Sequence, residues 1–463
     1  MTKLAILGAG PGGYIAALKA AQLGVSVVLI EDYEVGGTCL HWGCIPTKTL
    51  VATAEALIKI KESSAFGINL EGGAIKPDIN KILERKDKVI STQVKGIHGL
   101  LKSWGVELIH GRGKFAGPKT IEVDLKSGGT QRVEAEKIII ATGSRPAQIP
   151  TFPFDKKRIL SSDDALQLNE IPKSLLVIGA GVIGCEYAFI FNELGTKITM
   201  VEMMPRALAT VDEEIASILQ REIKKNKMTL VTGITVDKID VRKDGVTATL
   251  ANGKTVETEK VLVSIGRSFN TDNIGLEAAG VQTGKRGEIL VNKKMETSQE
   301  GVYAIGDCIG GIMLAHVASS EGIVAVENAL GGSCDMNYDV VPYGIFTIPE
   351  LGCVGLTEKE AQDKGFSIKV GRFQYRALGK AHAMGELTGM VKIVAEQGTD
   401  KILGGHIIGA RASDMVHEIA LAMQKGLTVM DVAHTIHAHP TLSEAIMEAA
   451  EDVHGRAIHS PKK

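Results

Sequence analysis

Two cysteines five residues apart, Cys39 and Cys44, are the residues of this chain best suited to redox chemistry. They lie in the segment GGTCLHWGCIPTK, residues 36–48. Two thiols beside a bound redox cofactor can open and close as a disulfide and so transfer two electrons. In an ideal α-helix, residues i and i+5 have Cα atoms about 8–9 Å apart, beyond the roughly 7 Å limit for a disulfide. The backbone must therefore leave helical geometry here, which Gly43 and Pro46 permit.

A dinucleotide-binding fingerprint precedes the cysteines. An apolar strand is followed by Gly8, Gly10 and Gly13, then by an alanine-rich helix and a second apolar run that ends in Glu31. The glycines serve the tight turn, the approach of a pyrophosphate and helix packing, and the acid accepts hydrogen bonds from ribose hydroxyls. Alone, the cysteine spacing is more typical of two small buried side chains. This setting favours a redox pair instead.

A second copy of the fingerprint spans residues 174–202, with Gly179, Gly181 and Gly184 followed by Glu202. Two copies predict two dinucleotides, a tightly bound FAD and an exchanging nicotinamide coenzyme. The alternative is a duplicated fold with one degenerate site, but this copy keeps every glycine and its acid. Glu202 favours NAD, because a carboxylate there repels the 2′-phosphate of NADP. We interpret Arg206, four residues later, as structural.

Composition limits the other function classes. At 463 residues the chain suits two or three domains, and its formal charge of -2, without a long basic run, argues against nucleic acid as a partner. No apolar stretch reaches membrane-spanning length and a strand starts at Leu4, so we expect no signal peptide, no membrane contact and a cytoplasmic location. The other four cysteines lack metal-ligand spacing, so we expect no metal site.

The remaining patterns predict the domain order. Helical patterns fill residues 50–100, residues 106–125 alternate like a small β-meander, and the apolar runs near 136–146 and 260–270 each end in a glycine turn. We therefore expect an FAD-binding domain over 1–146, an NAD-binding domain over 147–266, a return to the first domain over 267–335 and a dimerisation domain over 336–463.

The order of motifs GxGxxG, GGTCxxxGC, ATGSRP, GxGxxG, GR and AIGD resembles the pyridine nucleotide-disulfide oxidoreductase family along the whole chain. HAHPTLSE at 437–444 and MLAH at 313–316 resemble its dihydrolipoamide dehydrogenase branch. The resemblance implies an α/β fold with two Rossmann-like FAD/NAD(P)-binding domains and a C-terminal α+β dimerisation domain. It also implies a homodimer that oxidises protein-bound dihydrolipoamide with NAD, serving lipoyl-bearing subunits of 2-oxo acid dehydrogenase or glycine cleavage complexes.

The same resemblance assigns the catalytic roles. Cys39 is the exchange thiol and Cys44 passes electrons to the flavin. His439 is the base, held by Glu444, and this pair faces the cysteines of the partner subunit. Spacing alone leaves open a polar patch of His434, His437 and His439, or a metal cluster.

Further residues are expected to bind the cofactors. Lys48 pairs with Glu186 near the flavin ring, Asp307 accepts a hydrogen bond from a ribityl hydroxyl, and Gly266 lies near the nicotinamide coenzyme. The remaining candidates are expected along the FAD: Thr38, Gly113, Thr142, Gly143, Met313, Leu314, Ala315 and His316.

The loop between the cysteines departs from the family pattern at His41 and Trp42, and the segment 348–350 reads IPE instead of HPE. His41 could alter the thiol pKa values, and Trp42 could narrow access or pack internally, which we favour. The departures leave open an NADH-dependent reductase of another small disulfide or a metal ion. A flavin-binding structural subunit without activity is a third possibility, which the intact catalytic set disfavours.

Overall fold

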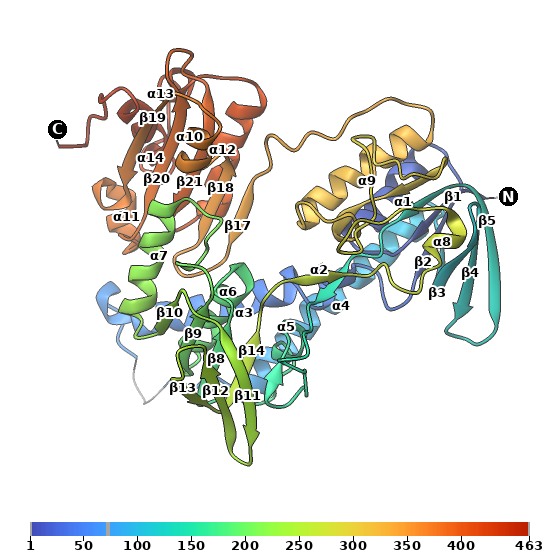
Figure 1. Cartoon of the computed structure of the whole chain (residues 1–463). Helices are drawn as coiled ribbons and strands as arrows, with labels where there is room; N and C mark the ends of the chain where they lie inside the picture. Colours follow the sequence, from blue (N-terminus) through green and yellow to red (C-terminus); the bar gives the residue numbers. More distant parts are fainter. Residues whose placement is uncertain (1, 71–74, 462–463) are drawn as a thin grey trace.

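The structure is a computed structural model and describes residues 2–70 and 75–461. Figure 1 shows a first unit, built from the blue start of the chain and a later yellow segment, apart from two units that stack on each other. Of these two, the green unit comes from the middle of the chain and the orange and red unit from its end. The predicted α/β fold, with two Rossmann-like units and a C-terminal α+β unit, is confirmed.

The first unit is a parallel sheet in the order β3-β2-β1-β5-β16. Its central strands are apolar on both faces, because helices pack on one face and an antiparallel meander packs on the other. The far halves of β3 and β5 pair with β4 as the predicted antiparallel meander. The strands are β1 (Thr2–Leu7), β2 (Val27–Glu31), β3 (Glu107–Gly117), β4 (Thr120–Leu125), β5 (Thr130–Ile140) and β16 (Val302–Ala304).

The return of the chain to the first unit places α9 (Ala315–Ala329) against α1 (Pro11–Gln22). Glycines let these helices approach closely, because a Cβ on Gly322 would stand 2.8 Å from the carbonyl oxygen of Gly12. With β16 beside β5, the loops that follow β1, β2, β5 and β16 meet at one edge of the sheet. Ligands of parallel α/β sheets bind at this edge.

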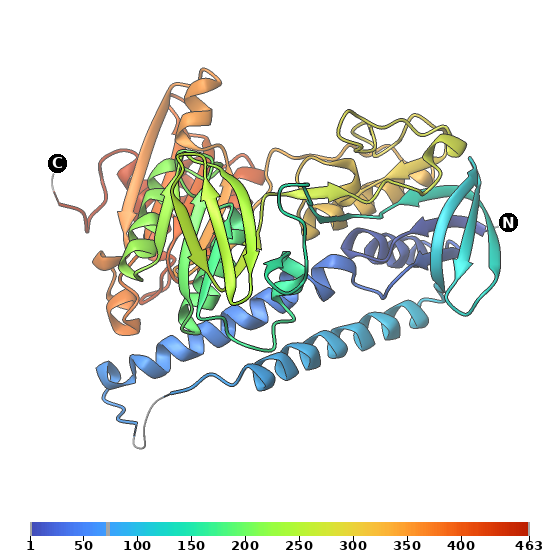
Figure 2. The ribbon, with the colours of Figure 1, turned by 60° about the horizontal axis from the view of Figure 1, so that its bottom comes forward.

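Two long helices leave the redox segment and lie side by side along one side of the molecule (Figure 2). Asp78 caps the second by accepting hydrogen bonds from the N–H groups of Asn80 and Lys81. The predicted helices of residues 50–100 are therefore present. This part of the chain contains α2 (Gly37–His41), α3 (Cys44–Lys61), η1 (Ser63–Phe66) and α4 (Ile79–Ser103).

The second unit repeats the plan of the first, with a parallel sheet in the order β10-β9-β8-β14-β7 and a separate three-stranded meander. Its elements are β7 (Ile159–Leu160), α5 (Ser162–Ala165), β8 (Ser174–Ile178), α6 (Val182–Glu193), β9 (Lys197–Glu202), α7 (Glu213–Lys225), β10 (Thr229–Thr232), β11 (Val236–Arg242), β12 (Gly245–Leu250), β13 (Thr255–Thr258) and β14 (Lys260–Val263). The two connections to the first unit pair as β6 (Ser144–Pro146) and β15 (Arg267–Phe269), and α8 (Leu276–Ala279) and η2 (Gly306–Ile309) follow.

The C-terminal unit is an antiparallel sheet in the order β17-β18-β21-β20-β19, packed against helices. Its elements are β17 (Tyr343–Ile345), β18 (Leu351–Gly355), α10 (Glu358–Asp363), β19 (Ile368–Gln374), η3 (Tyr375–Ala377), α11 (Gly379–Met384), β20 (Met390–Glu396), β21 (Ile402–Ile408), α12 (Ala412–Gln424), α13 (Val429–Ala433) and α14 (Glu444–Asp452). Across residues 2–70 and 75–461, no helix combines the length and apolar character needed to cross a bilayer.

A buried ion pair joins the second unit to the C-terminal unit. Lys392 on β20 and Asp212 before α7 are both almost fully buried, and the lysine Nζ lies 2.9 Å from each carboxylate oxygen. Glu358 lies 2.7 Å from the same Nζ atom. These contacts fix the two units against each other.

Candidate active site

A cavity of about 1370 Å³ lies at the edge where the parallel strands of the first unit end. Most residues predicted for FAD and for the redox pair line it. They are Gly8, Gly10, Glu31, Thr38, Cys39, Cys44, Lys48, Gly113, Thr142, Gly143, Glu186, Asp307, Met313, Leu314, Ala315 and His316. Residues from positions 7 to 417 therefore meet in one site.

The first glycine turn has the shape that a dinucleotide requires. A Cβ on Gly8, at φ +105°, would stand 2.3 Å from the carbonyl oxygen of Ala141, and one on Gly13 would stand 1.9 Å from that of Gly8. Gly13 thus packs behind the turn and does not line the cavity. No side chain caps α1 at Gly10, so the first N–H groups of the helix are available to a pyrophosphate.

The second glycine turn has the same construction in the second unit. Gly179, at φ +96°, lies against the carbonyl oxygen of Ser264, and Gly184 lies against Gly179. Gly181 is the N-cap residue of α6, and no side chain caps this helix. Gly179, Gly181, Gly184, Glu202 and Gly266 lie outside the residues that line the large cavity, at the second turn and its neighbouring strands.

Both acids at the strand ends are fixed by backbone N–H groups. Glu31 accepts 2.7 Å hydrogen bonds from Ala9 and Tyr33, and Glu202 accepts bonds of 2.6 and 2.8 Å from Ala180 and Met204. Burial raises the pKa of Glu31, although the two N–H groups act in the opposite direction. Because each carboxylate oxygen has two lone pairs, both acids can still accept from ribose hydroxyls.

Arg206 is committed to the backbone, as the sequence led us to expect. Its guanidinium donates 2.8 Å hydrogen bonds to the carbonyl oxygens of Leu208 and Val211. This geometry fits a structural arginine beside Glu202 and favours NAD over NADP.

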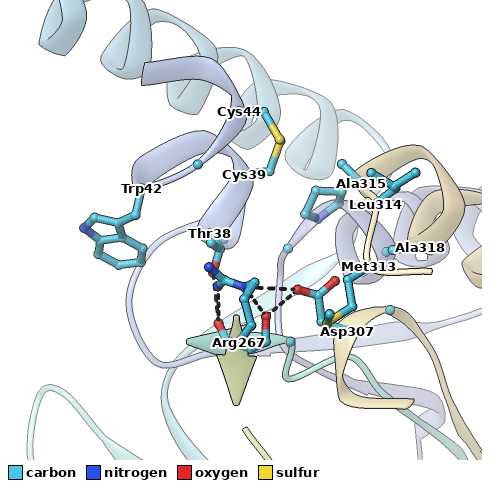
Figure 3. A pocket seen from close by; sticks show the side chains of 18 of the residues that line it. Thr38, Cys39, Trp42, Cys44, Arg267, Asp307, Met313, Leu314, Ala315 and Ala318 are labelled. Atoms are coloured by element: carbon cyan, nitrogen blue, oxygen red, sulfur yellow. Dashed lines mark hydrogen bonds and ion pairs between the residues drawn. The ribbon is translucent and has the colours of Figure 1, made fainter. Parts of the chain in front are cut away.

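The helix break predicted between the two cysteines is present. α2 ends at His41 and α3 begins at Cys44, with Gly43 between them at φ -133° and ψ -114°. A Cβ on Gly43 would stand 3.3 Å from the Cα atom of Cys39, so the turn is tight. The Cys39 and Cys44 side chains, free cysteines in this structure, point toward each other (Figure 3).

The two thiols differ in acidity. The hydrogen bond from Cys39 lowers the pKa of Cys44 to about 7, against the effect of burial, and the nearby Lys48 lowers it further. Donating that bond, together with burial, raises the pKa of Cys39. Cys44 is also the first residue of α3, where the helix dipole favours a thiolate. The reduced pair therefore holds its negative charge on Cys44.

Lys48 connects all three units. Its Nζ atom lies 3.0 Å from both carboxylate oxygens of Glu186 on α6 and 4.5 Å from the centre of the Phe346 ring. Glu186 is buried and also accepts a 2.9 Å hydrogen bond from the N–H of Phe346. One lysine charge thus stays close to Cys44.

His439 and Glu444 form a hydrogen-bonded pair away from the cavity. The Nδ1 atom of His439 lies 2.8 Å from Glu444, whose other oxygen accepts from the N–H of Thr441. Burial opposes the charge of Glu444, but these two hydrogen bonds outweigh it and lower its pKa. The His439 side chain is 76% exposed and does not line the cavity, so a single chain does not bring it to the cysteines.

The neighbouring histidine is separate from this pair. The His437 side chain is only 5% exposed, and it contacts Glu418 at 2.8 Å and the carbonyl oxygen of Thr435 at 2.7 Å. His437 and His439 therefore face different partners, which argues against a shared polar patch.

Two dinucleotide turns, a thiol pair and a histidine–glutamate pair on a separate C-terminal unit agree with the family that the order of motifs resembles. Residues 2–322 match the pyridine nucleotide-disulphide oxidoreductase model, and residues 341–450 match the dimerisation domain of that family. The chain belongs to the pyridine nucleotide-disulphide oxidoreductase family.

Individual members of the family are similar along their whole length. The dihydrolipoyl dehydrogenase of Bacillus subtilis is 42% identical, with 98% of each chain covered. The crystal structure of LpdA from Mycobacterium tuberculosis is 30% identical with a TM-score of 0.92, covering 98% of this chain and 100% of that one. The HOCl-induced flavoprotein disulfide reductase RclA from Escherichia coli, in a Cu(II) complex, is 26% identical with a TM-score of 0.87. The match covers 98% of this chain and 99% of that one.

This pyridine nucleotide-disulphide oxidoreductase uses FAD and NAD, and its dimerisation domain indicates a homodimer. It is an NAD-dependent flavoprotein disulfide oxidoreductase. The residues present fit FAD. No side chain caps the start of α1, and the turn at Gly8 has no room for a side chain, so the backbone of this turn is open to a pyrophosphate. The expectation of two dinucleotides is therefore confirmed.

Sequence reasoning missed the two cavity residues that orient Asp307, Ser144 and Arg267. Ser144 donates a hydrogen bond to Asp307, and Arg267 donates to the Ser144 hydroxyl at 2.6 Å and to its carbonyl oxygen at 2.8 Å (Figure 3). The Arg267 Nε atom lies 3.7 Å from Asp307. These contacts fix the orientation of Asp307. The motifs ATGSRP and GR contain these two residues, but the sequence analysis assigned roles only to the neighbouring Gly143 and Gly266.

Proposed function

We propose that the protein oxidises protein-bound dihydrolipoamide to lipoamide and reduces NAD to NADH. The observation that carries the proposal is the Cys39–Cys44 pair at the start of α3, inside the dinucleotide cavity, with the pKa of Cys44 lowered to about 7. A thiolate formed near neutral pH suits thiol–disulfide exchange with a small dithiol. The similarity to dihydrolipoyl dehydrogenases supports the same substrate.

The reaction begins with Cys39 and Cys44 joined as a disulfide. His439 of the partner subunit takes the proton of one substrate thiol. The resulting thiolate attacks the sulfur of Cys39, which forms a substrate–Cys39 disulfide and breaks the bond to Cys44. Cys44 leaves as a thiolate, which Lys48 and the start of α3 stabilise.

The second substrate thiol then closes the lipoamide ring. Its sulfur attacks the substrate sulfur bound to Cys39, and its proton passes to Cys39. The products are lipoamide, a Cys39 thiol, a Cys44 thiolate and a protonated His439, so two electrons have moved from substrate to protein. This distribution agrees with the raised pKa of Cys39 and the lowered pKa of Cys44. When bound, FAD supplies the two-electron acceptor between this dithiol and NAD.

The exposed setting of His439 supports its role at a subunit interface. Its ring is held through Nδ1 by Glu444 and its side chain is 76% exposed, so Nε2 is the ring nitrogen assigned as the proton acceptor. The substrate of such a site must be long and thin enough to enter between subunits. A lipoyl group on a flexible lysine arm of a 2-oxo acid dehydrogenase or glycine cleavage complex fits that description.

The proposal is tested by the initial rate of NADH formation from dihydrolipoamide, compared with other small dithiols and with NADP in place of NAD. We expect dihydrolipoamide with NAD to be the preferred pair. The second candidate, reduction of another disulfide or of a metal ion by NADH, is suggested by the similarity to RclA. NADH consumption with such an acceptor, together with no activity on dihydrolipoamide, would replace the proposal by that candidate.

A further inference from the structure

The loop between the redox cysteines carries two aromatic residues, His41 and Trp42, that the dithiol chemistry does not use. The Trp42 ring points away from the two sulfur atoms (Figure 3). Its centre lies 4.5 Å from that of the Tyr33 ring, at an interplanar angle of 43°. His41 contacts the edge of Tyr33 at 5.2 Å, and its Nε2 atom lies 2.9 Å from the carbonyl oxygen of Val35. The three rings form one cluster.

The cluster is separate from the groups that control the thiols. The pKa values of Cys39 and Cys44 respond to each other, to burial, to Lys48 and, for Cys44, to Glu186. Trp42 does not narrow access to the sulfur atoms, because its ring points to the other side of the loop (Figure 3). Trp42 therefore packs against Tyr33, but it is half-buried and lines the cavity instead of lying in the core as we expected.

Tyr33 marks the end of the cavity where the cluster lies. It follows Glu31, the acid at the end of β2, by two residues and donates its N–H to that carboxylate. This acid identifies the adenosine end of a dinucleotide site. Tyr33 and Trp42 both line the cavity, as do the neighbouring Asp32 and Arg112. Lys126 fixes Tyr33 further by donating to its carbonyl oxygen at 2.9 Å.

We propose that Trp42, supported by Tyr33, is a positioning residue for the adenosine half of FAD. Adenosine offers a flat aromatic base, and aromatic side chains bind such bases by stacking and by excluding water. Trp42 is two residues from Cys44 and three from Cys39, so the loop that holds the disulfide also contacts the far end of the cofactor. FAD binding and the shape of the redox loop are thereby linked. The inference does not depend on which dithiol the enzyme oxidises.

The test compares FAD release from the Trp42→Val and Trp104→Val holoenzymes, followed by the rise in flavin fluorescence. Trp104 is the matched control, because it is the other tryptophan and lies 47% exposed at the end of α4. We expect release to be roughly tenfold faster in Trp42→Val and unchanged in Trp104→Val. Trp42→Phe, which keeps an aromatic ring, should lie between wild type and Trp42→Val.

Binding of a second ligand distinguishes the loss of a contact with adenosine from a general loosening of the loop that carries Trp42. FMN lacks the adenosine half, so its affinity for the apoprotein should be the same in wild type and Trp42→Val. Equal weakening of FAD and FMN, or unchanged FAD release in folded Trp42→Val, would overturn the proposal.

A measurement without any change at position 42 covers the case in which Trp42→Val does not fold. In Trp104→Phe apoprotein, Trp42 is the sole tryptophan. ADP contains the adenosine but no flavin, and we expect it to quench the emission of Trp42. Emission that is unchanged at saturating ADP would contradict the proposal.

Discussion

The Nζ atom of Lys48 lies 3.0 Å from both carboxylate oxygens of Glu186. Lys48 is on α3, one helical turn beyond Cys44. The lysine lowers and the glutamate raises the pKa of the Cys44 thiol. The pair therefore balances the charge next to the redox sulfur while it joins α3 to α6. Replacing Lys48 and replacing Glu186 by a neutral residue should therefore shift the pKa of Cys44 in opposite directions.

We predict that Lys48→Met raises the pKa of Cys44 above its value of about 7 and that Glu186→Gln lowers it. At a fixed pH near 7, the thiolate fraction of the reduced enzyme then falls in the first variant and rises in the second. Ultraviolet thiolate absorbance against pH, with Cys44→Ser as the blank, measures both. Shifts of the same sign would show that the two charges do not act on Cys44 as we describe.

Glu444 is predicted to assist catalysis by orienting His439. Its lowered pKa keeps it charged at neutral pH, and Glu444→Gln should reduce kcat by roughly 10²- to 10⁴-fold, the range for loss of general-base catalysis. The control is Glu418→Gln, which changes the carboxylate beside His437 in the same way. Steady-state rates with dihydrolipoamide and NAD decide the matter, and equal losses in the two variants would remove the special role of Glu444.

Local features of the sequence were enough to predict the redox segment and both nucleotide turns. Cys39 and Cys44 are five residues apart, and Gly43 provides the break between their helices. The contact between Arg267 and Ser144 joins residues 123 positions apart through the β6–β15 pairing, so no local pattern could reveal it. The direction of the Trp42 side chain was also open, because only the fold decides which side of the loop faces Tyr33.

The separation of His439 from the cysteines has a different cause. The sequence could pair His439 with Glu444 because they are five residues apart, and the structure places their side chains 2.8 Å from each other. Neither residue lines the cavity, although Ser413 and His417 of the same C-terminal unit do, so the separation comes from where the pair lies within that unit. A site completed by a second subunit is a property of the dimer, which the resemblance implied and spacing could not.

Coenzyme choice is predicted to depend on Glu202. Glu202→Gln removes the negative charge that opposes a 2′-phosphate, so the preference for NAD over NADP should fall about tenfold or more. Arg206→Lys is the control, because Arg206 is bonded to two backbone carbonyls instead of facing the coenzyme. The ratio of kcat/KM for the two coenzymes measures the effect. If Arg206→Lys changes the preference for NAD over NADP and Glu202→Gln does not, then Arg206, and not Glu202, discriminates between the coenzymes.

The buried Lys392 is predicted to hold the second and C-terminal units together. Lys392→Met leaves the almost fully buried Asp212 without its cation, which should lower the free energy of unfolding by about 3–5 kcal/mol. Lys359→Met, at a surface ion pair with Asp363, should cost less than about 1 kcal/mol. Urea unfolding of the holoenzyme compares them, and equal midpoints would contradict this role.

The ion pair of Lys392 and Asp212 also predicts how the free energy of unfolding changes as the pH falls. The pKa of Asp212 is lowered, because the hydrogen bond from Lys392 and other contacts outweigh burial. The stability that Asp212 contributes is therefore present above the ordinary pKa of an aspartate and is lost as the pH falls through its lowered value. Wild type should lose more stability than Lys392→Met between neutral and acid pH, since the variant has already lost this contribution.

The most direct test of the account is dihydrolipoamide-dependent NADH formation by a mixture of Cys44→Ser and His439→Gln subunits. Each variant alone should be nearly inactive. In a mixed dimer of two-fold symmetry, one site combines the intact cysteines of one subunit with the intact His439 of the other. Random reassociation should thus restore about one quarter of the wild-type rate. A mixture that stays as inactive as its components would contradict a dithiol site shared between subunits.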